Sequence, residues 1–240
     1  MLISIITEGI ASGDWRNLII GALLVITSSL IALSVHEAAH GLAAYMMGDR
    51  TAYNLGRVTL NPAKHLDLMG TLMMLVFGFG WAKPVPINAR NFKNSKWGMA
   101  LTGIAGPVAN IILGTIGAIL YGFITPLCVK LSLSEGLVSN LANVLPLFFY
   151  LLAMYNFIFM AFNLIPLPPF DGSRFFYAFL PIKLYFKVMQ YERYILIGMF
   201  ICLFLLSRVF GFSPFSWIAD RLLYTISTPF KKLGVIAFLY

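Results

Sequence analysis

Charge is the property that this sequence most clearly lacks. Only 11% of its 240 residues are Asp, Glu, Lys or Arg, whereas a soluble domain normally carries about 25%. Hydrophobic residues make up 60% of the chain, and the mean hydropathy is +0.85. These values exclude an ordinary soluble domain and predict a polytopic protein whose helices cross a lipid bilayer.

Cysteine is also scarce. Cys128 and Cys202 are the two cysteines, and they support neither a disulfide framework nor a cysteine metal site. The net charge of +8 comes from Lys and Arg scattered between apolar segments, which indicates basic cytoplasmic loops and no nucleic-acid partner. The N-terminal stretch "MLISIITEGIASGDW" contains Glu8 and Asp14 and has no early basic residue, so it is not typical of a cleaved signal peptide.

Long apolar runs are what the chain has instead, and about 20 such residues cross a bilayer. Clear crossings are expected at 18–47, 99–124, 141–165 and 194–212. Three segments are ambiguous: 68–80 has the length of a re-entrant element, 173–190 is mixed, and 215–240 has the composition of an amphipathic or peripheral helix.

The expected fold is therefore an all-α polytopic membrane protein with about five to six membrane helices. We expect a single membrane-embedded domain over 1–240, with its core at about 18–180. Residues 181–240 add a membrane helix and an amphipathic tail.

The first crossing carries the sequence "HEAAH", which begins at His36. His36 and His40 are four residues apart, so they lie on one face of a helix. Two imidazoles so placed suit one zinc ion, with Glu37 as general base for water. The alternative is a chance cluster of polar residues near a helix end. Two of only three histidines fall in this pattern inside an apolar helix, and this favours the metal site.

A catalytic zinc normally has three protein ligands, and the chain has nine acidic residues, most of them in loops or flanks. Asp171 follows a crossing that the prolines of "NLIPLPPFDG" must end near Asn163. Counting crossings places Asp171 on the same side of the membrane as the two histidines. An Asp-Gly turn with a helix cap is the alternative, but a two-histidine site that needs an acidic partner favours the ligand.

The distribution of Lys and Arg predicts orientation, because basic loops stay in the cytoplasm. On one side of the membrane the expected segments hold only Arg16, in the N-terminal flank, and Lys130, in the loop 125–140. The other side holds Arg50, Arg57, Lys64, Lys83, Arg90, Lys93, Lys96, Arg174, Lys183, Lys187 and Arg193. We therefore expect a multi-pass protein of the cell (inner or plasma) membrane with its N-terminus outside. His36 lies about 27 Å along the helix from residue 18, so the active site is expected toward the cytoplasmic side.

Two polar segments accompany these helices. "TAYNLGRVTL", residues 51–60, has the turn signals of a short hairpin. In "WAKPVPIN", residues 81–88, two prolines enforce an extended backbone, which at membrane depth persists only beside protein or water. We expect a re-entrant or strand-like loop near the active site. It offers either a strand edge that pairs with an unwound substrate or a structural lining of the cavity.

Together these motifs resemble those of a known family. "HEAAH" in a first apolar helix, "GPVAN" at 106–110 and "NLIPLPPFDG" at the end of a later helix resemble the signatures of the site-2 proteases, which are intramembrane zinc metalloproteases. "GWAKPVPIN" is similar to compact bacterial and archaeal members, so neither a PDZ domain nor a nucleotide-sensing domain is expected in these 240 residues. Phe170 stands where the family usually has leucine. The resemblance covers about residues 18–180.

The resemblance implies His36, His40 and Asp171 as ligands of one Zn²⁺ per chain and Glu37 as the catalytic acid/base. The implied reaction is hydrolysis of peptide bonds in or near transmembrane segments, within regulated intramembrane proteolysis. The implied partners are the lipid bilayer and membrane proteins that carry a transmembrane helix. The sequence does not indicate an oligomeric state.

Three further residues are candidates. The motif position of Asn163 implies contact with the substrate or an oxyanion, and the alternative is that it caps the broken backbone before Pro166. Asn110 lies in a stripe of small residues that lets helices approach closely, and it is a second candidate for the substrate or for a hydrogen bond to the active site. His65 either assists the chemistry or has a structural role at the interface.

Two other functions compete with the protease. A non-catalytic zinc-binding membrane protein or metal transporter would spread its polar ligands along a pathway, whereas here they share one depth with a general base. An inactive relative that escorts membrane helices is the third possibility, and the intact Glu37 argues against it.

Overall fold

A computed structural model describes residues 14–70, 82–131, 137–181, 184, 187–188, 190–209 and 211–239. Within these residues the regular structure is helical, apart from one isolated antiparallel bridge between Leu66 and Ala82. This confirms the all-α prediction. The elements are α2 (Trp15–Met46), α3 (Thr51–Asn54), η1 (Pro62–Lys64), η2 (Ala89–Asn91), α5 (Ser95–Leu131), α6 (Leu137–Asn163), α7 (Asp171–Tyr177), α9 (Glu192–Val209) and α10 (Pro214–Leu239).

Three helices of the described part of the chain are long and apolar enough to cross a membrane: α2, α5 and α6. They correspond to three of the four clear crossings expected. The fourth falls on α9, whose apolar stretch, Arg193–Leu203, is shorter than a span requires. A total of five to six crossings stays a prediction, and most of the expected re-entrant segment at 68–80 lies outside the described residues.

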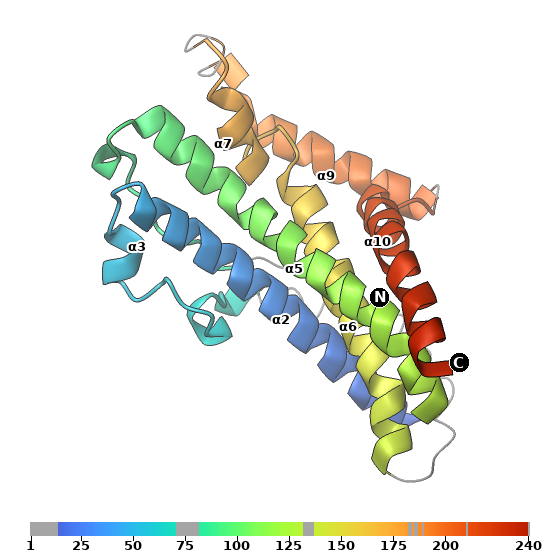
Figure 1. Ribbon diagram of the computed structural model, residues 1–240. Helices are drawn as coiled ribbons and strands as arrows, with labels where there is room; N and C mark the ends of the chain where they lie inside the picture. The colour runs from blue at the N-terminus through green and yellow to red at the C-terminus, as the bar shows by residue number, and fades with distance from the viewer. Residues whose placement is uncertain are drawn as a thin grey trace.

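Helix α5 is the centre of the bundle, and it packs against α2, α6 and α10. Figure 1 shows α2, α5 and α6 side by side, with α10 on the side of the bundle away from α2. Small residues allow these close contacts: a Cβ at Gly114 would lie 2.7 Å from the ring of Phe157 on α6. Ala118, Phe157 and Leu223 belong to the core that joins α5, α6 and α10. The tail helix predicted as amphipathic or peripheral thus packs on the bundle.

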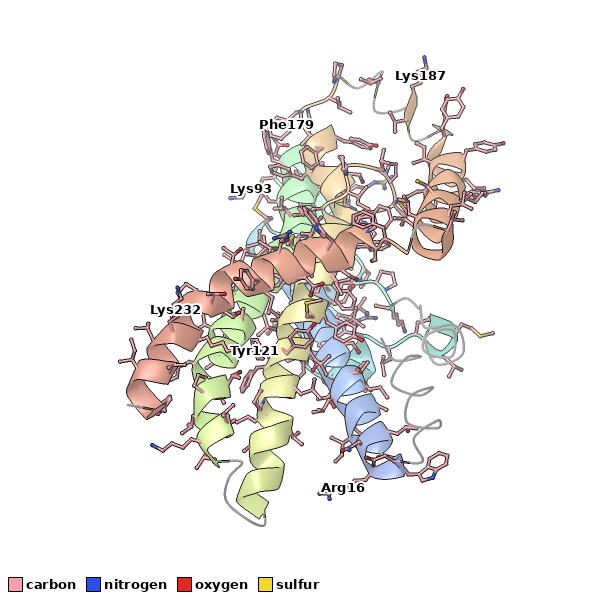
Figure 2. All side chains as sticks on the ribbon, turned by 90° about the vertical axis from the view of Figure 1, so that its right-hand side faces the viewer. Arg16, Lys93, Tyr121, Phe179, Lys187 and Lys232 are labelled. Atoms are coloured by element: carbon pink, nitrogen blue, oxygen red, sulfur yellow. The ribbon has the colours of Figure 1, made fainter. Side chains whose placement is uncertain are left out.

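The helix ends that lie nearest the motifs "HEAAH", "GPVAN" and "NLIPLPPFDG" are at the same end of the bundle. Figure 1 places the end of α2, the start of α5, the end of α6 and α7 at one end of the molecule. Figure 2 shows Lys93 and Lys187 at this end and Arg16 at the opposite end. The uneven distribution of basic residues along the sequence therefore becomes a difference between the two ends of the bundle.

The boundaries of two helices place the candidate site. Helix α2 begins after Asp14, whose carboxylate accepts a hydrogen bond from the N–H of Asn17 at 3.1 Å, and the chain turns away at Gly48 with a φ of 108°. His36 and His40 thus lie in its last third. Helix α6 ends at Asn163, as the prolines predict, and Asp171 begins α7.

The predicted hairpin at 51–60 is wrong. Thr51–Asn54 forms the short helix α3, and none of the described residues at 51–60 is in a strand. The carboxylate of Asp49 accepts from the backbone N–H of Thr51 at 3.0 Å, which starts the turn. The N–H of Arg57 then donates to the carbonyl of Ala52 at 2.9 Å. Local bonds of this kind satisfy the backbone without a cross-strand ladder.

Candidate active site

Three predicted residues converge on one point. The Nε2 atoms of His36 and His40 are 3.0 Å apart, and each lies 3.1 Å from Oδ2 of Asp171. Helix α2 supplies the two imidazoles one turn apart, and the first residue of α7 supplies the carboxylate. Both histidines are buried, and the Asp171 side chain is 15% exposed. The structure therefore brings together the three predicted ligands, although Asp171 lies 135 residues after His36 and 131 residues after His40 in the sequence.

The other ring nitrogens decide where the protons lie. Nδ1 of His36 donates to Oδ1 of Asn110 at 2.5 Å, and Nδ1 of His40 donates to the carbonyl of Thr102 at 2.7 Å. A carbonyl oxygen only accepts, so both Nδ1 atoms carry the proton and a neutral ring has its lone pair at Nε2. Three acceptor atoms then face each other with no proton between them, an arrangement that a cation stabilises.

The spacing also fits zinc. Tetrahedral zinc sites have bonds of about 2.0 Å to nitrogen and oxygen, which gives roughly 3.3 Å between neighbouring ligand atoms. The observed separations of 3.0 and 3.1 Å are close to that value. Asp171 supplies a carboxylate oxygen, a ligand that zinc accepts beside two imidazoles.

A glycine of α5 leaves room for both rings. A Cβ atom at Gly106 would lie 2.5 Å from Nε2 of His40 and 2.6 Å from Cε1 of His36. The next residue, Pro107, has no N–H and disturbs the preceding turn of the helix, where the carbonyl of Thr102 accepts from His40. The "GPVAN" sequence thus shapes the wall of the site.

Asn110 completes that wall and was a candidate for binding the substrate. Its Oδ1 accepts from His36, while its Nδ2 donates to the carbonyl of Ala32 at 3.2 Å and to Oδ1 of Asn156 at 2.7 Å. Asn110 is fully buried and its amide is engaged at both ends. The geometry matches the hydrogen bond to the active site that the sequence left open. Asn156 was missed, although an amide inside an apolar helix is a signal that could have found it.

Glu37 lies on a different side of α2 from the ligand contacts and meets the extended segment 82–88. Its Oε2 accepts from the backbone N–H of Val85 at 3.1 Å. The carbonyl of Lys83 accepts from Arg57 at 2.6 Å, and the N–H of Lys83 donates to the carbonyl of His65 at 2.8 Å. Segment 82–88 therefore lies against the predicted base and is tied to the preceding loop.

The predicted strand edge is partly occupied. Val85 uses its N–H for Glu37, whereas Ile87 has no hydrogen-bond partner within the described residues. Pro84 and Pro86 have no N–H to offer on the other edge. Pairing of this segment with a substrate stays a prediction.

A buried carboxylate anchors the far end of segment 82–88, and the sequence did not single it out. Asp49 is fully buried, and it accepts from the N–H of Asn88 at 2.7 Å and from Nδ2 of Asn91 at 2.7 Å, besides the N–H and hydroxyl of Thr51. Burial raises the pKa of Asp49, but these hydrogen bonds lower it below its usual value. Asp49 thus joins the end of α2 to the loop that meets Glu37.

Two other candidates lie apart from the three converging atoms. Nδ2 of Asn163 donates to the carbonyl of Phe159 at 3.1 Å, so its side chain turns back onto its own helix. His65 is fully buried, and its Nε2 donates to the carbonyl of Thr59 at 2.8 Å. The contact of His65 matches a structural role, whereas that of Asn163 is to a carbonyl inside its own helix and does not cap the backbone before Pro166. The catalytic roles of both residues stay predictions.

Comparisons with known proteins agree with the motifs. The model of Peptidase family M50 matches residues 21–206. A protein of Bacillus subtilis (strain 168) described as "Putative zinc metalloprotease YwhC" is 42% identical over 171 residues, which cover 71% of this chain and 75% of that protein. "Putative zinc metalloprotease Rip2" of Mycolicibacterium smegmatis is 28% identical over 99 residues, 39% of this chain and 38% of that protein.

No solved structure matches the chain significantly. The family model nevertheless spans α2, α5, α6 and α7, the helices on which the site residues lie. The chain belongs to peptidase family M50, the site-2 protease family that its paired motifs "HEAAH" and "NLIPLPPFDG" indicate.

Proposed function

We propose that this chain is an intramembrane zinc metalloprotease that hydrolyses peptide bonds in or near the transmembrane segments of membrane proteins, within regulated intramembrane proteolysis. Its family membership supports a zinc metalloprotease. The observation that carries the proposal is the convergence of three proton-free acceptor atoms, from His36, His40 and Asp171, with a carboxylate that is not one of them, Glu37, next to His36 in the chain.

The proposed ligands of one zinc ion are Nε2 of His36, Nε2 of His40 and Oδ2 of Asp171. A zinc ion held there supplies a Lewis acid that acidifies water and polarises the scissile carbonyl. Glu37 takes the proton from water and delivers it to the leaving amine. The N–H of Val85 holds the Glu37 carboxylate in one orientation.

The membrane placement belongs to the same proposal. The basic residues near the site-bearing end support a cytoplasmic location for that end and an outside location for the N-terminus. Substrates would then present a single transmembrane helix whose scissile bond must unwind, since a helical peptide bond is covered by its own side chains. A cell-membrane location and membrane-protein partners follow from this topology.

Replacement of the base tests the reaction. The full chain, purified with zinc, is incubated with a panel of single-span membrane proteins beside Glu37→Gln, which keeps the shape and removes the base. We expect the variant to retain zinc and to lose about 10²–10⁴-fold in cleavage rate. Equal cleavage by both proteins would refute the mechanism, and zinc binding without cleavage by the wild type would favour the non-catalytic alternative.

Replacement of the carboxylate ligand tests the metal centre. Asp171→Ala leaves two imidazoles, so we expect zinc content to fall from one per chain toward zero after dialysis against a chelator. Asp220→Ala is the matched control, because this carboxylate lies on α10 outside the site. Zinc content that survives Asp171→Ala unchanged would remove Asp171 from the ligand set.

A further inference from the structure

We propose that Asn156 on α6 is a positioning residue for the metal ligand His36. It fixes the orientation of the Asn110 amide, and through it the ring nitrogen that His36 presents to the metal. The proposal rests on the proposed function, because it concerns the ligand set of that zinc site. It deepens that function by adding a third helix to the support of one ligand.

The orientation starts at the backbone of α6. Nδ2 of Asn156 donates to the carbonyl of Leu152, one turn earlier, at 2.7 Å. A backbone carbonyl only accepts, so the amide of Asn156 must direct its NH₂ group there and its Oδ1 away. Asn156 is fully buried, so an amide that lacked these bonds would have no water to replace them. One flip state of Asn156 is therefore strongly preferred.

The orientation of the Asn156 amide determines the orientation of the Asn110 amide. Oδ1 of Asn156 accepts from Nδ2 of Asn110 at 2.7 Å, so Asn110 must present its NH₂ group to α6. The carbonyl of Ala32 on α2 accepts from the same NH₂ group at 3.2 Å and supports the same orientation. Oδ1 of Asn110 is then left facing His36.

The imidazole is the third member of this chain of hydrogen bonds. Oδ1 of Asn110 accepts from Nδ1 of His36 at 2.5 Å, so Nδ1 carries the proton and Nε2 carries the lone pair. If the Asn110 amide were reversed, its NH₂ group would face Nδ1 and favour the wrong tautomer for a metal bond through Nε2. Because Ala32 also holds the amide, loss of Asn156 weakens the preference and does not abolish it.

A purely packing role for Asn156 predicts something different. Hydrogen bonds between membrane helices hold helices together and contribute to stability. Such a role would lower thermal stability after substitution and leave the metal affinity of the folded protein unchanged. A positioning role changes how the site binds metal in protein that is still folded, and the two roles are separable by measuring metal affinity and stability on the same samples.

The test compares Asn156→Leu, which keeps the volume and removes both hydrogen bonds, with Met154→Ala as control. Met154 is a buried residue of the same helix, and it belongs to the core and not to this chain of bonds. Zinc affinity is measured by chelator competition, and Co²⁺ is substituted to record its visible spectrum. We expect Asn156→Leu to bind zinc about 10-fold more weakly and to alter the Co²⁺ spectrum, and Met154→Ala to do neither.

Two further variants, Asn156→Asp and Asn156→Ser, test the proposal if Asn156→Leu fails to fold. Asn156→Asp keeps an acceptor oxygen opposite Nδ2 of Asn110, so it should hold zinc more tightly than Asn156→Ser, which is too short to reach. Unchanged zinc affinity and an unchanged Co²⁺ spectrum in folded Asn156→Leu, or in Asn156→Ser, would overturn the proposal. An equal effect of Met154→Ala would also overturn it. A wild-type chain that binds no zinc through His36 would instead overturn the proposed function.

Discussion

The two sides of the site are held in different ways. The proposed ligands are held by helices: His36 by Asn110 on α5, and His40 by the Thr102 carbonyl on the same helix. The proposed base, Glu37, is held by the N–H of Val85 in an extended loop. That loop is fixed in turn by Arg57 and Asp49, which lie outside the membrane-spanning helices.

This difference separates the binding of metal from the chemistry on water. The ligand side depends on close packing of α2, α5 and α6, which bury the polar groups that bond to the histidines. The base side depends on a few hydrogen bonds to one carboxylate and one guanidinium. A change in the loop should therefore lower the cleavage rate while zinc stays bound, and a change in the helices should remove both.

The largest effect is expected on the ligand side at Gly106. Gly106→Val adds a branched side chain where even a Cβ would lie 2.5 Å from Nε2 of His40, so the rings and α5 must separate. We expect zinc content and cleavage both to become undetectable. Metal analysis and a cleavage assay on the same purified sample check this.

Gly198→Val is the control for Gly106→Val. A Cβ at Gly198 on α9 meets no atom within 4 Å, so this helix accepts the same change without contact to the site. Full zinc occupancy in Gly106→Val would show that the rings tolerate separation, and the helical side would then not control metal binding.

An intermediate effect is expected on the base side at Val85. Val85→Pro removes the N–H that Glu37 accepts, and a hydrogen bond to a charged group contributes about 1.5–3 kcal/mol. We expect kcat/KM to fall roughly 10- to 100-fold while zinc content stays at the wild-type level. Ile87→Pro is the matched control, since the N–H of Ile87 has no partner within the described residues. Loss of zinc in Val85→Pro alone would break the separation between the two sides.

The smallest effect is expected at Asp49, and it depends on pH. The folded-state pKa of Asp49 lies below its unfolded value, so its stabilisation is complete above the unfolded value of about 3.9 and is lost as pH falls through the folded value. Asp49→Asn should therefore be about 1–2 kcal/mol less stable than wild type near pH 7. The two proteins should converge in strongly acidic detergent solution.

Thermal unfolding of both proteins across a pH series measures the Asp49 effect. Asp67→Asn provides a control, because Asp67 is another carboxylate of the connection between α2 and α5, and its Oδ1 accepts from the backbone N–H of Gly70 at 2.8 Å. A constant difference between Asp49→Asn and wild type at all pH values would mean that the carboxylate's charge is not what secures the loop.

The parts of the site that depend on helical spacing, on the length of apolar runs or on proline were predictable from the sequence. A four-residue spacing places two imidazoles on one face of any helix, and counting apolar runs places Asp171 at their depth. The end of α6 at Asn163 follows from prolines that cannot continue a helix. In each case a local rule decides the geometry, and the structure agrees with it.

The parts that depend on individual side-chain hydrogen bonds were not predictable. The hairpin at 51–60 is wrong because Asp49 closes a turn around Thr51, which residue preferences for strands do not include. Asn156 was missed because the residue it joins to the site, Asn110, lies on another helix 46 residues earlier. The catalytic roles considered for Asn163 and His65 rest on motif position and composition, and their side chains bond to nearby carbonyls.

The groups that surround Asp49 have a consequence for how the loop responds to salt. Its four donors are two backbone N–H groups, a hydroxyl and a side-chain amide, and none carries a net charge. Dissolved ions screen attractions between charged groups, most strongly at exposed positions, but they leave short bonds between a buried carboxylate and neutral donors largely unchanged. The attachment of the loop to α2 should therefore be equally stable at low and at high ionic strength. The position of the loop against Glu37 should then not depend on the salt concentration of the solution beside the membrane.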